Sequence, residues 1–243
     1  MLGGLVAGIE AGDDDEGDED AIVPAQGPSV KRQTICFDES FPSAAPNFQL
    51  LVDAGPGCGG ITWPAAEVLT AYLANILALN PSWLEGKRIV ELGAGTGAVS
   101  MALARMMKKR GSRTTIYSTD QAILLDLMDA NTVLNDVGDT VNVRELSWGE
   151  TIASEMQTPD IILAADCVYF EPAFPLLMKT LRLLATPTSE ILFCYKKRRK
   201  ADKRFFVMLR KVFTVTAVVE DFVCHRDFRR EAIFLYRLSL RSR

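Results

Sequence analysis

The segment Arg88-Ile-Val-Glu-Leu-Gly-Ala-Gly-Thr-Gly97 indicates the fold more clearly than any other part of the chain. An apolar strand that contains Glu91 leads into three alternate glycines, and a helix-forming segment follows them. The glycines are Gly93, Gly95 and Gly97. Glycines at a strand-to-helix turn let the backbone turn sharply and let a ligand approach more closely than any Cβ would allow. Because open α/β sheets bind ligands at the carboxyl ends of their strands, we interpret this stretch as a ligand-binding turn rather than a turn without a ligand.

Strands and helices alternate along the chain from this turn. The alternation predicts an α/β fold: a Rossmann-like seven-stranded, mostly parallel sheet with helices on both faces. No clear helix separates the last two strands, which predicts an antiparallel C-terminal hairpin at one edge. The predicted strands are 88–92, 115–118, 141–146, 161–165, 190–195, 215–219 and 232–238. The predicted helices are one that begins at Pro64, then 99–109, 122–134, 172–184 and 203–212.

The first 30 residues differ in composition from the rest of the chain. The 243 residues carry a formal net charge of −4, and segment 10–20 alone has eight acidic residues and no basic one. Such a segment cannot bury enough apolar surface to offset the entropy of ordering it. We therefore predict a disordered acidic tail over residues 1–30 and one folded domain over residues 31–243. The domain begins with an extension made of two short strands, 33–37 and 48–52, and the first helix.

Simple counts exclude several classes of protein. No stretch reaches the ~18–20 apolar residues of a membrane helix. No basic residue precedes Lys31, whereas a secretory or transit peptide would carry basic residues there. The five cysteines are scattered and form no C-x-x-C pair, and the only histidine is His225. We therefore predict no metal site, no disulfide framework and a reducing, cytoplasmic location.

Two kinds of cofactor fit the glycine turn. Glu91 precedes the glycines in the E-x-G-x-G-x-G form that is typical of S-adenosylmethionine enzymes. Gly93, Gly95 and Ala98 also fit the G-x-G-x-x-A pattern of nicotinamide enzymes. No catalytic Tyr-Lys pair is evident downstream, which favours S-adenosylmethionine over a dinucleotide-dependent oxidoreductase. At the end of the next strand, Asp120 is placed either to bind a ribose diol or to cap a helix.

A second candidate site follows the apolar strand 161–165. Asp166 terminates this strand and Tyr169 follows three residues later, so a carboxylate and a phenol stand at one strand end. The alternative for Asp166 is a cap for the helix that follows. Trp63 and Trp148 lie near other strand–helix junctions, where they either pack in the core or flank an adenine or a methionine chain.

The basic run Lys196-Lys-Arg-Arg-Lys200 is compatible with several roles. Such a run is usually a solvated face, but it also fits a nuclear signal, an RNA patch or a dock for a partner protein. No aromatic residues of an RNA-stacking kind interleave with it. A non-catalytic basic binding module that keeps a vestigial cofactor pocket therefore stays an alternative to an enzyme.

Together these motifs resemble the seven-strand lysine methyltransferases of family 16, from about residue 30 to the end of the chain. The matching segments are 61–66, 91–97, 118–120, 146–150 and 164–169. Segments 57–60, 171–177 and 195–203 are most similar to fungal members that act on a translation elongation factor. The resemblance implies an S-adenosylmethionine-dependent protein-lysine N-methyltransferase domain over residues 31–243, with translation elongation factor 1-alpha as the protein substrate.

The resemblance also implies the site residues. Its cofactor contacts map onto Trp63, Gly93, Ala94, Gly95, Asp120, Trp148 and Ala165. The glycine motif adds Glu91 and Gly97. We assign Asp166 and Tyr169 as catalytic residues, which orient the neutral amine of the substrate lysine. A monomer that requires neither membrane nor nucleic acid is expected to carry out this reaction without a metal.

Overall fold

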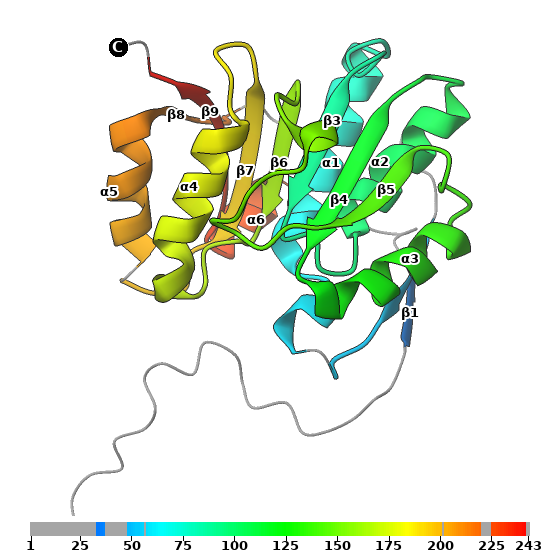
Figure 1. Cartoon of the computed structure of the whole chain (residues 1–243), viewed down its shortest axis with the longest axis horizontal. Helices are drawn as coiled ribbons and strands as arrows, with labels where there is room; N and C mark the ends of the chain where they lie inside the picture. The colour runs from blue at the N-terminus through cyan, green and yellow to red at the C-terminus, as the bar shows by residue number, and fades with distance from the viewer. Residues whose placement is uncertain (1–32, 37–47, 56, 201, 220–224, 242–243) are drawn as a thin grey trace, which may run out of the picture.

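A computed structural model describes residues 33–36, 48–55, 57–200, 202–219 and 225–241. The predicted acidic tail, residues 1–30, lies outside the described residues. The main sheet has the strands β3 (Arg88–Leu92), β4 (Thr115–Asp120), β5 (Val141–Glu145), β6 (Ile161–Ala165), β7 (Glu190–Lys196), β8 (Phe213–Ala217) and β9 (Ile233–Leu240). Their order across the sheet is β5-β4-β3-β6-β7-β9-β8 (Figure 1).

The sheet is parallel except at its C-terminal edge. Strands β3 to β7 pair in parallel, whereas β9 runs antiparallel between β7 and β8. The predicted fold class and the antiparallel hairpin are thus confirmed. The expectation that no helix separates the last two strands is wrong, because α6 (His225–Arg230) lies between them. Its six residues are mostly charged, so they carry no apolar repeat that a sequence reading could detect.

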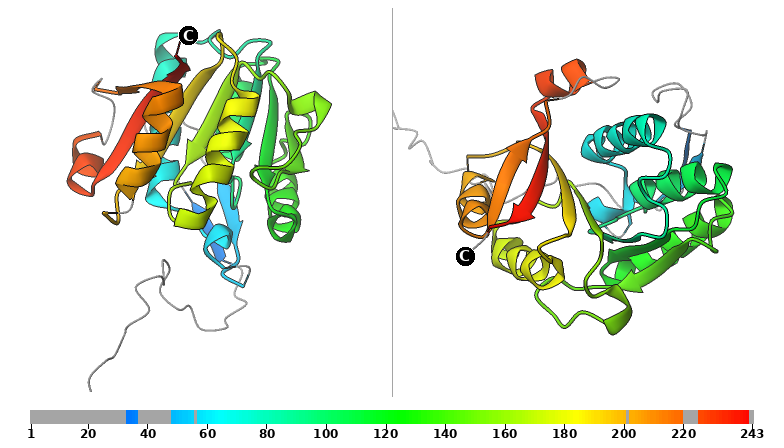
Figure 2. Two further views of the ribbon diagram at one scale, coloured as in Figure 1. Left: turned by 60° about the vertical axis from the view of Figure 1, so that its left-hand side comes forward. Right: turned by 90° about the horizontal axis from the view of Figure 1, so that it is seen from above.

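Helices cover both faces of the sheet (Figures 1 and 2). The longer helices are α1 (Pro64–Leu79), α2 (Ala98–Lys109), α3 (Leu125–Leu134), α4 (Phe174–Leu184) and α5 (Asp202–Val212). Successive residues of a strand point to opposite faces. Accordingly, Ile89 of β3 packs in the core with α1 and α2, and the next residue, Val90, packs in the core with α4 and α5. Two short 3₁₀ segments, η2 (Ala122–Leu124) and η4 (Glu171–Ala173), lead into α3 and α4.

The N-terminal extension brings a second loop to the carboxyl ends of the strands. Strands β1 (Gln33–Cys36) and β2 (Gln49–Val52) form a separate antiparallel pair. The side chain of Asn131 in α3 fixes β2, since it accepts from the Leu51 N–H at 2.6 Å and donates to the Leu51 carbonyl at 3.0 Å. The 3₁₀ turn η1 (Cys58–Gly60) follows β2 and precedes α1.

Among the described residues, none of the helices combines the length and apolar character that crossing a membrane requires. The described His, Cys, Asp and Glu side chains form no group of three or more that could hold a metal ion.

Candidate active site

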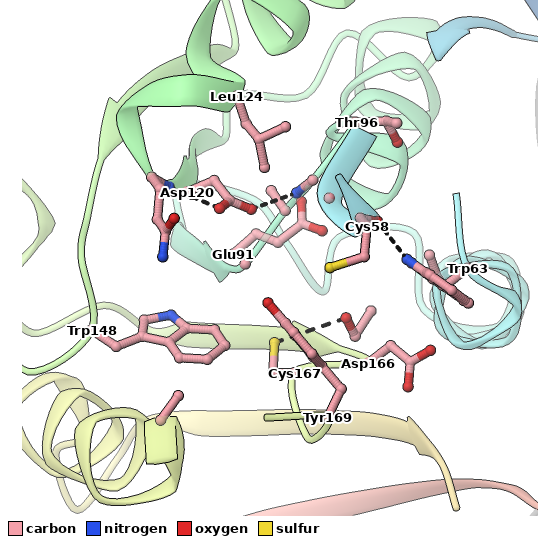
Figure 3. A pocket seen from close by; sticks show the side chains of 18 of the residues that line it. Cys58, Trp63, Glu91, Thr96, Asp120, Leu124, Trp148, Asp166, Cys167 and Tyr169 are labelled. Carbon is pink, nitrogen blue, oxygen red and sulfur yellow. Dashed lines mark hydrogen bonds between the residues drawn. The ribbon is translucent and has the colours of Figure 1, made fainter. Parts of the chain in front are cut away.

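A cavity of about 410 Å³ opens at the carboxyl ends of β3, β4 and β6 (Figure 3). Ligand pockets in proteins usually enclose roughly 300–1,000 Å³, so this volume suits a small cofactor. Ten of the eleven predicted site residues line the cavity: Trp63, Glu91, Gly93, Ala94, Gly95, Asp120, Trp148, Ala165, Asp166 and Tyr169. Gly97 is the exception, because it precedes α2 and a Cβ there would meet the side chains of Met101 and Ser118.

The glycine turn is pressed against the turn η1. Gly95 has a φ of +59°, and a Cβ at this position would come within 2.7 Å of the Gly59 carbonyl oxygen. The hydroxyls of Thr62 and Thr96 hydrogen bond at 3.2 Å beside this contact. The glycine at position 95 is therefore required by another segment of the protein backbone, whatever ligand the turn holds. Two glycine-rich segments that lie far apart in sequence form one wall of the cavity.

Two carboxylates, the buried Glu91 and the partly buried Asp120, hold the shape of this wall. Glu91 Oε2 accepts hydrogen bonds from the backbone N–H of Ser100, at 3.0 Å, and from the Ser100 hydroxyl. Asp120 Oδ2 accepts from the Gly95 N–H at 2.8 Å, and its Oδ1 accepts from the Gln121 N–H at 2.8 Å. Asp120 thus fixes the glycine turn. The alternative, in which Asp120 caps the following helix, is not observed, because η2 has no side-chain cap hydrogen bond.

Burial changes the titration of both carboxyls. It raises the pKa of Glu91 from an ordinary 4.5 to about 7, although the Ser100 hydrogen bonds oppose the change. Burial also raises the pKa of Asp120, against the hydrogen bonds from Gly95 and Gln121. Burial raises a carboxyl pKa because the charged form loses its hydration. Both side chains would therefore gain from a positively charged ligand in the cavity.

Aromatic side chains stand on opposite sides of the cavity (Figure 3). Trp148 follows β5, and a Cβ on Gly93 would come within 3.0 Å of its ring. Trp63 precedes α1, and its indole N–H donates to the Cys58 carbonyl at 2.8 Å. The apolar side chains of Leu124 and Leu146 also line the cavity. These surfaces suit a flat, partly apolar group such as a purine.

Asp166 directly follows β6, in an unusual backbone conformation and in a dense hydrogen-bond network. Its φ is +60°, a left-handed value that aspartate tolerates better than most residues. The guanidinium of Arg198 donates to both carboxylate oxygens, at 2.8 Å to Oδ1 and 2.6 Å to Oδ2. The Lys196 N–H also donates to Oδ1, at 3.1 Å. Arg198 in turn stacks on Trp63, 5.0 Å from the ring centroid.

Tyr169 projects its ring into the cavity between Trp148 and Trp63 (Figure 3). Burial raises the pKa of its hydroxyl above the ordinary 10.0, so the phenol stays protonated at neutral pH. Its backbone carbonyl accepts a hydrogen bond from Arg199 at 2.6 Å. The structure therefore brings Asp166 and Tyr169 to the same cavity as the glycine turn, with Asp166 already ion-paired.

Two contributions to this site were not predicted from the sequence. Cys58 and Gly59 line the cavity, although their glycine-rich loop had no assigned role. Arg198 lines it too, from a basic run interpreted as a surface feature. Strand pairing is the signal that could have found Arg198. Because β6 and β7 are parallel neighbours, the residues that follow β7 come to lie beside Asp166.

A family model described as "Lysine methyltransferase" (Methyltransf_16) matches residues 43–212. The chain belongs to this family. Protein-lysine N-methyltransferase EFM6 of Saccharomyces cerevisiae is 34% identical over 238 residues, which cover 90% of this chain and 95% of the relative. Protein N-lysine methyltransferase METTL21A of Danio rerio is 36% identical, with 74% of this chain and 77% of the relative covered. EEF1A lysine methyltransferase 3 of Mus musculus is 40% identical, with 62% and 61% covered.

A solved structure agrees on the fold. The 16S rRNA N2 G1207 methyltransferase RsmC of T. thermophilus superposes with a TM-score of 0.61 at 16% identity, covering 88% of this chain and 52% of that chain. At this identity the likeness concerns the fold alone. Family membership makes the chain a lysine methyltransferase that uses S-adenosylmethionine, and it displaces the dinucleotide-dependent oxidoreductase and the vestigial binding module as interpretations.

The residues of the cavity fit S-adenosylmethionine. Trp148 and Leu124 offer flat and apolar surfaces for the adenine, and Asp120 offers carboxylate oxygens for the ribose diol. Each Asp120 oxygen accepts one hydrogen bond within the protein, so each retains a lone pair for a ligand. Glu91 and Asp120 also give this end of the cavity a negative charge that suits a sulfonium cation.

Proposed function

We propose that this chain transfers a methyl group from S-adenosylmethionine to a lysine of translation elongation factor 1-alpha. One observation carries the proposal: the Asp166–Tyr169 turn and the glycine turn line a single cavity. The acceptor is supported by the mouse relative, whose name specifies EEF1A as the protein that carries the lysine. The similarity to EFM6, named a protein-lysine N-methyltransferase, over 90% of this chain supports a protein lysine as the acceptor.

Bound S-adenosylmethionine supplies an activated sulfonium methyl group, so the protein residues need no covalent step. They must bring a lysine nitrogen in line with the methyl carbon. They must also accept the lysine as a neutral amine. A free lysine, with a pKa of ~10.4, is neutral only about once in two thousand molecules at pH 7. Burial beside Trp63 and Tyr169 lowers the pKa of the entering lysine, because the ammonium loses its hydration there.

Asp166 and Tyr169 are proposed to orient this amine. The Tyr169 phenol is neutral, so its oxygen accepts a hydrogen bond from the amine without attracting an ammonium strongly. Asp166 Oδ2 takes one hydrogen bond from Arg198 and so retains one acceptor position. Two fixed acceptors hold the N–H bonds and aim the nitrogen lone pair at the methyl group. Such contacts stabilise the transition state more than they stabilise bound cofactor.

The direct test is methyl transfer with a defined acceptor. The purified chain is incubated with tritiated S-adenosylmethionine and either purified elongation factor 1-alpha or a lysate from cells that lack the enzyme. We expect label in elongation factor 1-alpha, on one lysine identified by mass spectrometry. Label confined to a different protein would refute the acceptor and leave the enzyme class intact.

The catalytic assignment has its own test. Asp166→Ala is expected to lower the single-turnover rate at least about a hundredfold, or about 2.7 kcal/mol. The affinity for S-adenosylmethionine, measured by calorimetry, is expected to stay within a few-fold. Asp166→Asn controls for loss of packing, because it keeps the size and shape of the side chain. A folded, cofactor-binding and fully active Asp166→Ala protein would end the catalytic assignment.

We further propose that the chain acts as a monomer in the cytoplasm and needs no nucleic acid. The described Cys58, Cys167 and Cys194 carry free thiols, as is usual in a reducing compartment. Sedimentation of the purified chain and methylation assays with nuclease-treated substrate test the oligomeric state and the independence from nucleic acid.

A further inference from the structure

The basic run after β7 places two consecutive arginines against the Asp166–Tyr169 turn, and Arg198 also lines the cavity. Arg198 grips both carboxylate oxygens of Asp166, and Arg199 donates to the backbone carbonyl of Tyr169 at 2.6 Å. Their side chains are only 24% and 25% exposed, whereas the neighbouring Lys197 is an exposed residue. The two arginines therefore hold the two ends of the Asp166–Tyr169 turn.

The loop that carries the arginines is itself fixed. Asp202, at the start of α5, is 1% exposed, and its Oδ2 accepts from the N–H groups of Arg198 at 3.0 Å and Arg199 at 3.1 Å. Further along α5, Arg204 pairs with Glu171, just beyond the turn. Three arginines of one segment thus contact the stretch between β6 and α4. A merely solvated face would not make these contacts.

The turn depends on such contacts for its shape. Residues 166–170 belong to no helix or strand, although the Asp166 N–H still donates to the Cys194 carbonyl of β7 at 2.8 Å. Asp166 also keeps a left-handed backbone, which side-chain contacts must maintain. In-line methyl transfer is sensitive to placement, and a shift of about 1 Å can cost a hundredfold in rate.

We propose that Arg198 and Arg199 are positioning residues that orient Asp166 and Tyr169 toward the lysine amine. The proposal rests on the proposed function, because it assigns the arginines a role in that same reaction. It separates the basic run into two parts. Arg198 and Arg199 act on the turn, and the exposed Lys197 and Lys200 are left to face a protein substrate.

The kinetic test uses Arg198→Lys, Arg199→Ala and Arg199→Lys. A lysine cannot bridge two carboxylate oxygens as a guanidinium does, so Arg198→Lys is expected to lower the single-turnover rate at least about tenfold. Arg199→Ala is expected to do the same, and Arg199→Lys to restore most of the rate, because an ammonium can still donate to the Tyr169 carbonyl. In all three variants the affinity for S-adenosylmethionine is expected to stay within about threefold of wild type.

Lys108→Ala is the matched control. Lys108 makes the same kinds of contact, to the Asp136 carbonyl at 2.6 Å and to the Asp136 carboxylate at 2.8 Å. It lies in the last turn of α2, at the end away from the glycine turn, and does not line the cavity. Its removal should leave the rate unchanged. If Arg198→Lys and Arg199→Ala keep the wild-type rate at saturating substrate and only raise KM, the arginines dock substrate and the proposal is wrong.

A readout without substrate separates this inference from the choice of acceptor. Protein labelled with 3-fluorotyrosine gives one ¹⁹F resonance for each of the five tyrosines, and Tyr169→Phe assigns that of Tyr169. Arg199→Ala is expected to shift or broaden this resonance, whereas Lys108→Ala leaves it in place. An unchanged resonance overturns the proposal, even if wild type methylates elongation factor 1-alpha. If wild type does not methylate that protein, the acceptor is wrong and the fluorine spectrum still decides the role of Arg199.

Discussion

Replacing Glu91 with glutamine is expected to stabilise the protein at alkaline pH, although the side chain lines the cavity. Glu91 is 2% exposed, and both of its described donors belong to Ser100, a neutral residue. Burial raises its pKa from 4.5 to about 7. The folded state therefore binds a proton at this site more tightly than the unfolded chain does. Keeping the carboxyl ionised in the folded state therefore lowers the free energy of unfolding.

The sign and size of the effect follow from linkage. Between pH 4.5 and about 7 the folded state carries more protons at Glu91 than the unfolded state, so stability falls as pH rises through this window. The full loss is about 3 kcal/mol and is reached above the folded pKa. Glu91→Gln cannot titrate. The free energy of unfolding of the variant, relative to wild type, should therefore rise by about 3 kcal/mol from pH 4.5 to pH 8.

Urea unfolding at several pH values measures this difference directly. Asp120 also has a raised pKa and is present in both proteins, so the difference between them reports Glu91 together with the repulsion that Asp120 exerts on its ionised form. A difference between variant and wild type that does not change with pH would show that Glu91 does not titrate with a raised pKa in the folded state. Calorimetry gives a second check. Since cationic S-adenosylmethionine favours the ionised carboxylate, its affinity for wild type should increase with pH through about 7 more steeply than its affinity for Glu91→Gln.

Three further predictions concern the walls of the cavity and the loop beside it. Asp120→Ala should weaken S-adenosylmethionine binding, measured by calorimetry, by about 1–3 kcal/mol, since a charged acceptor is lost. Gly95→Ala should destabilise the fold more than Gly86→Ala. Both glycines have a left-handed φ, but only a Cβ at position 95 would meet the Gly59 carbonyl, at 2.7 Å. Equal urea midpoints for the two variants would contradict this expectation. Asp202→Ala should lower the free energy of unfolding by about 1–3 kcal/mol, because two backbone N–H groups lose their buried acceptor.

The sequence was sufficient for the fold and for the residues that line the cavity beside the glycine turn, because the information there is local. Glu91 and the glycines are contiguous, and an apolar run such as 161–165 marks a buried parallel strand directly. Once the strands are parallel neighbours, the residues at their carboxyl ends, Asp120 and Asp166, must converge on one edge. The lining of the cavity follows from these few facts.

Other contacts could not be predicted, because they join segments that no sequence pattern relates. A run of basic residues gives no sign of which side chains turn inward, and the partner of Arg198 lies 32 positions away. The glycine at position 95 was explained by a ligand, whereas the closest neighbour of its Cβ is the Gly59 carbonyl. Each contact depends on tertiary packing that overrides the local preference of its segment.

The distribution of charge in the cavity supports the proposed direction of the chemistry. At the end of the cavity beside the glycine turn, Glu91 and Asp120 accept hydrogen bonds from uncharged donors, so their negative charge remains available to a sulfonium cation. At the proposed lysine-binding end of the cavity, beside Tyr169, the charge of Asp166 is balanced by Arg198. An unbalanced carboxylate there would raise the pKa of an entering lysine and keep it as an ammonium, which cannot accept a methyl group. By pairing with Asp166, Arg198 removes that attraction while leaving one oxygen to orient the neutral amine, so a single ion pair reconciles holding the nitrogen with keeping it nucleophilic.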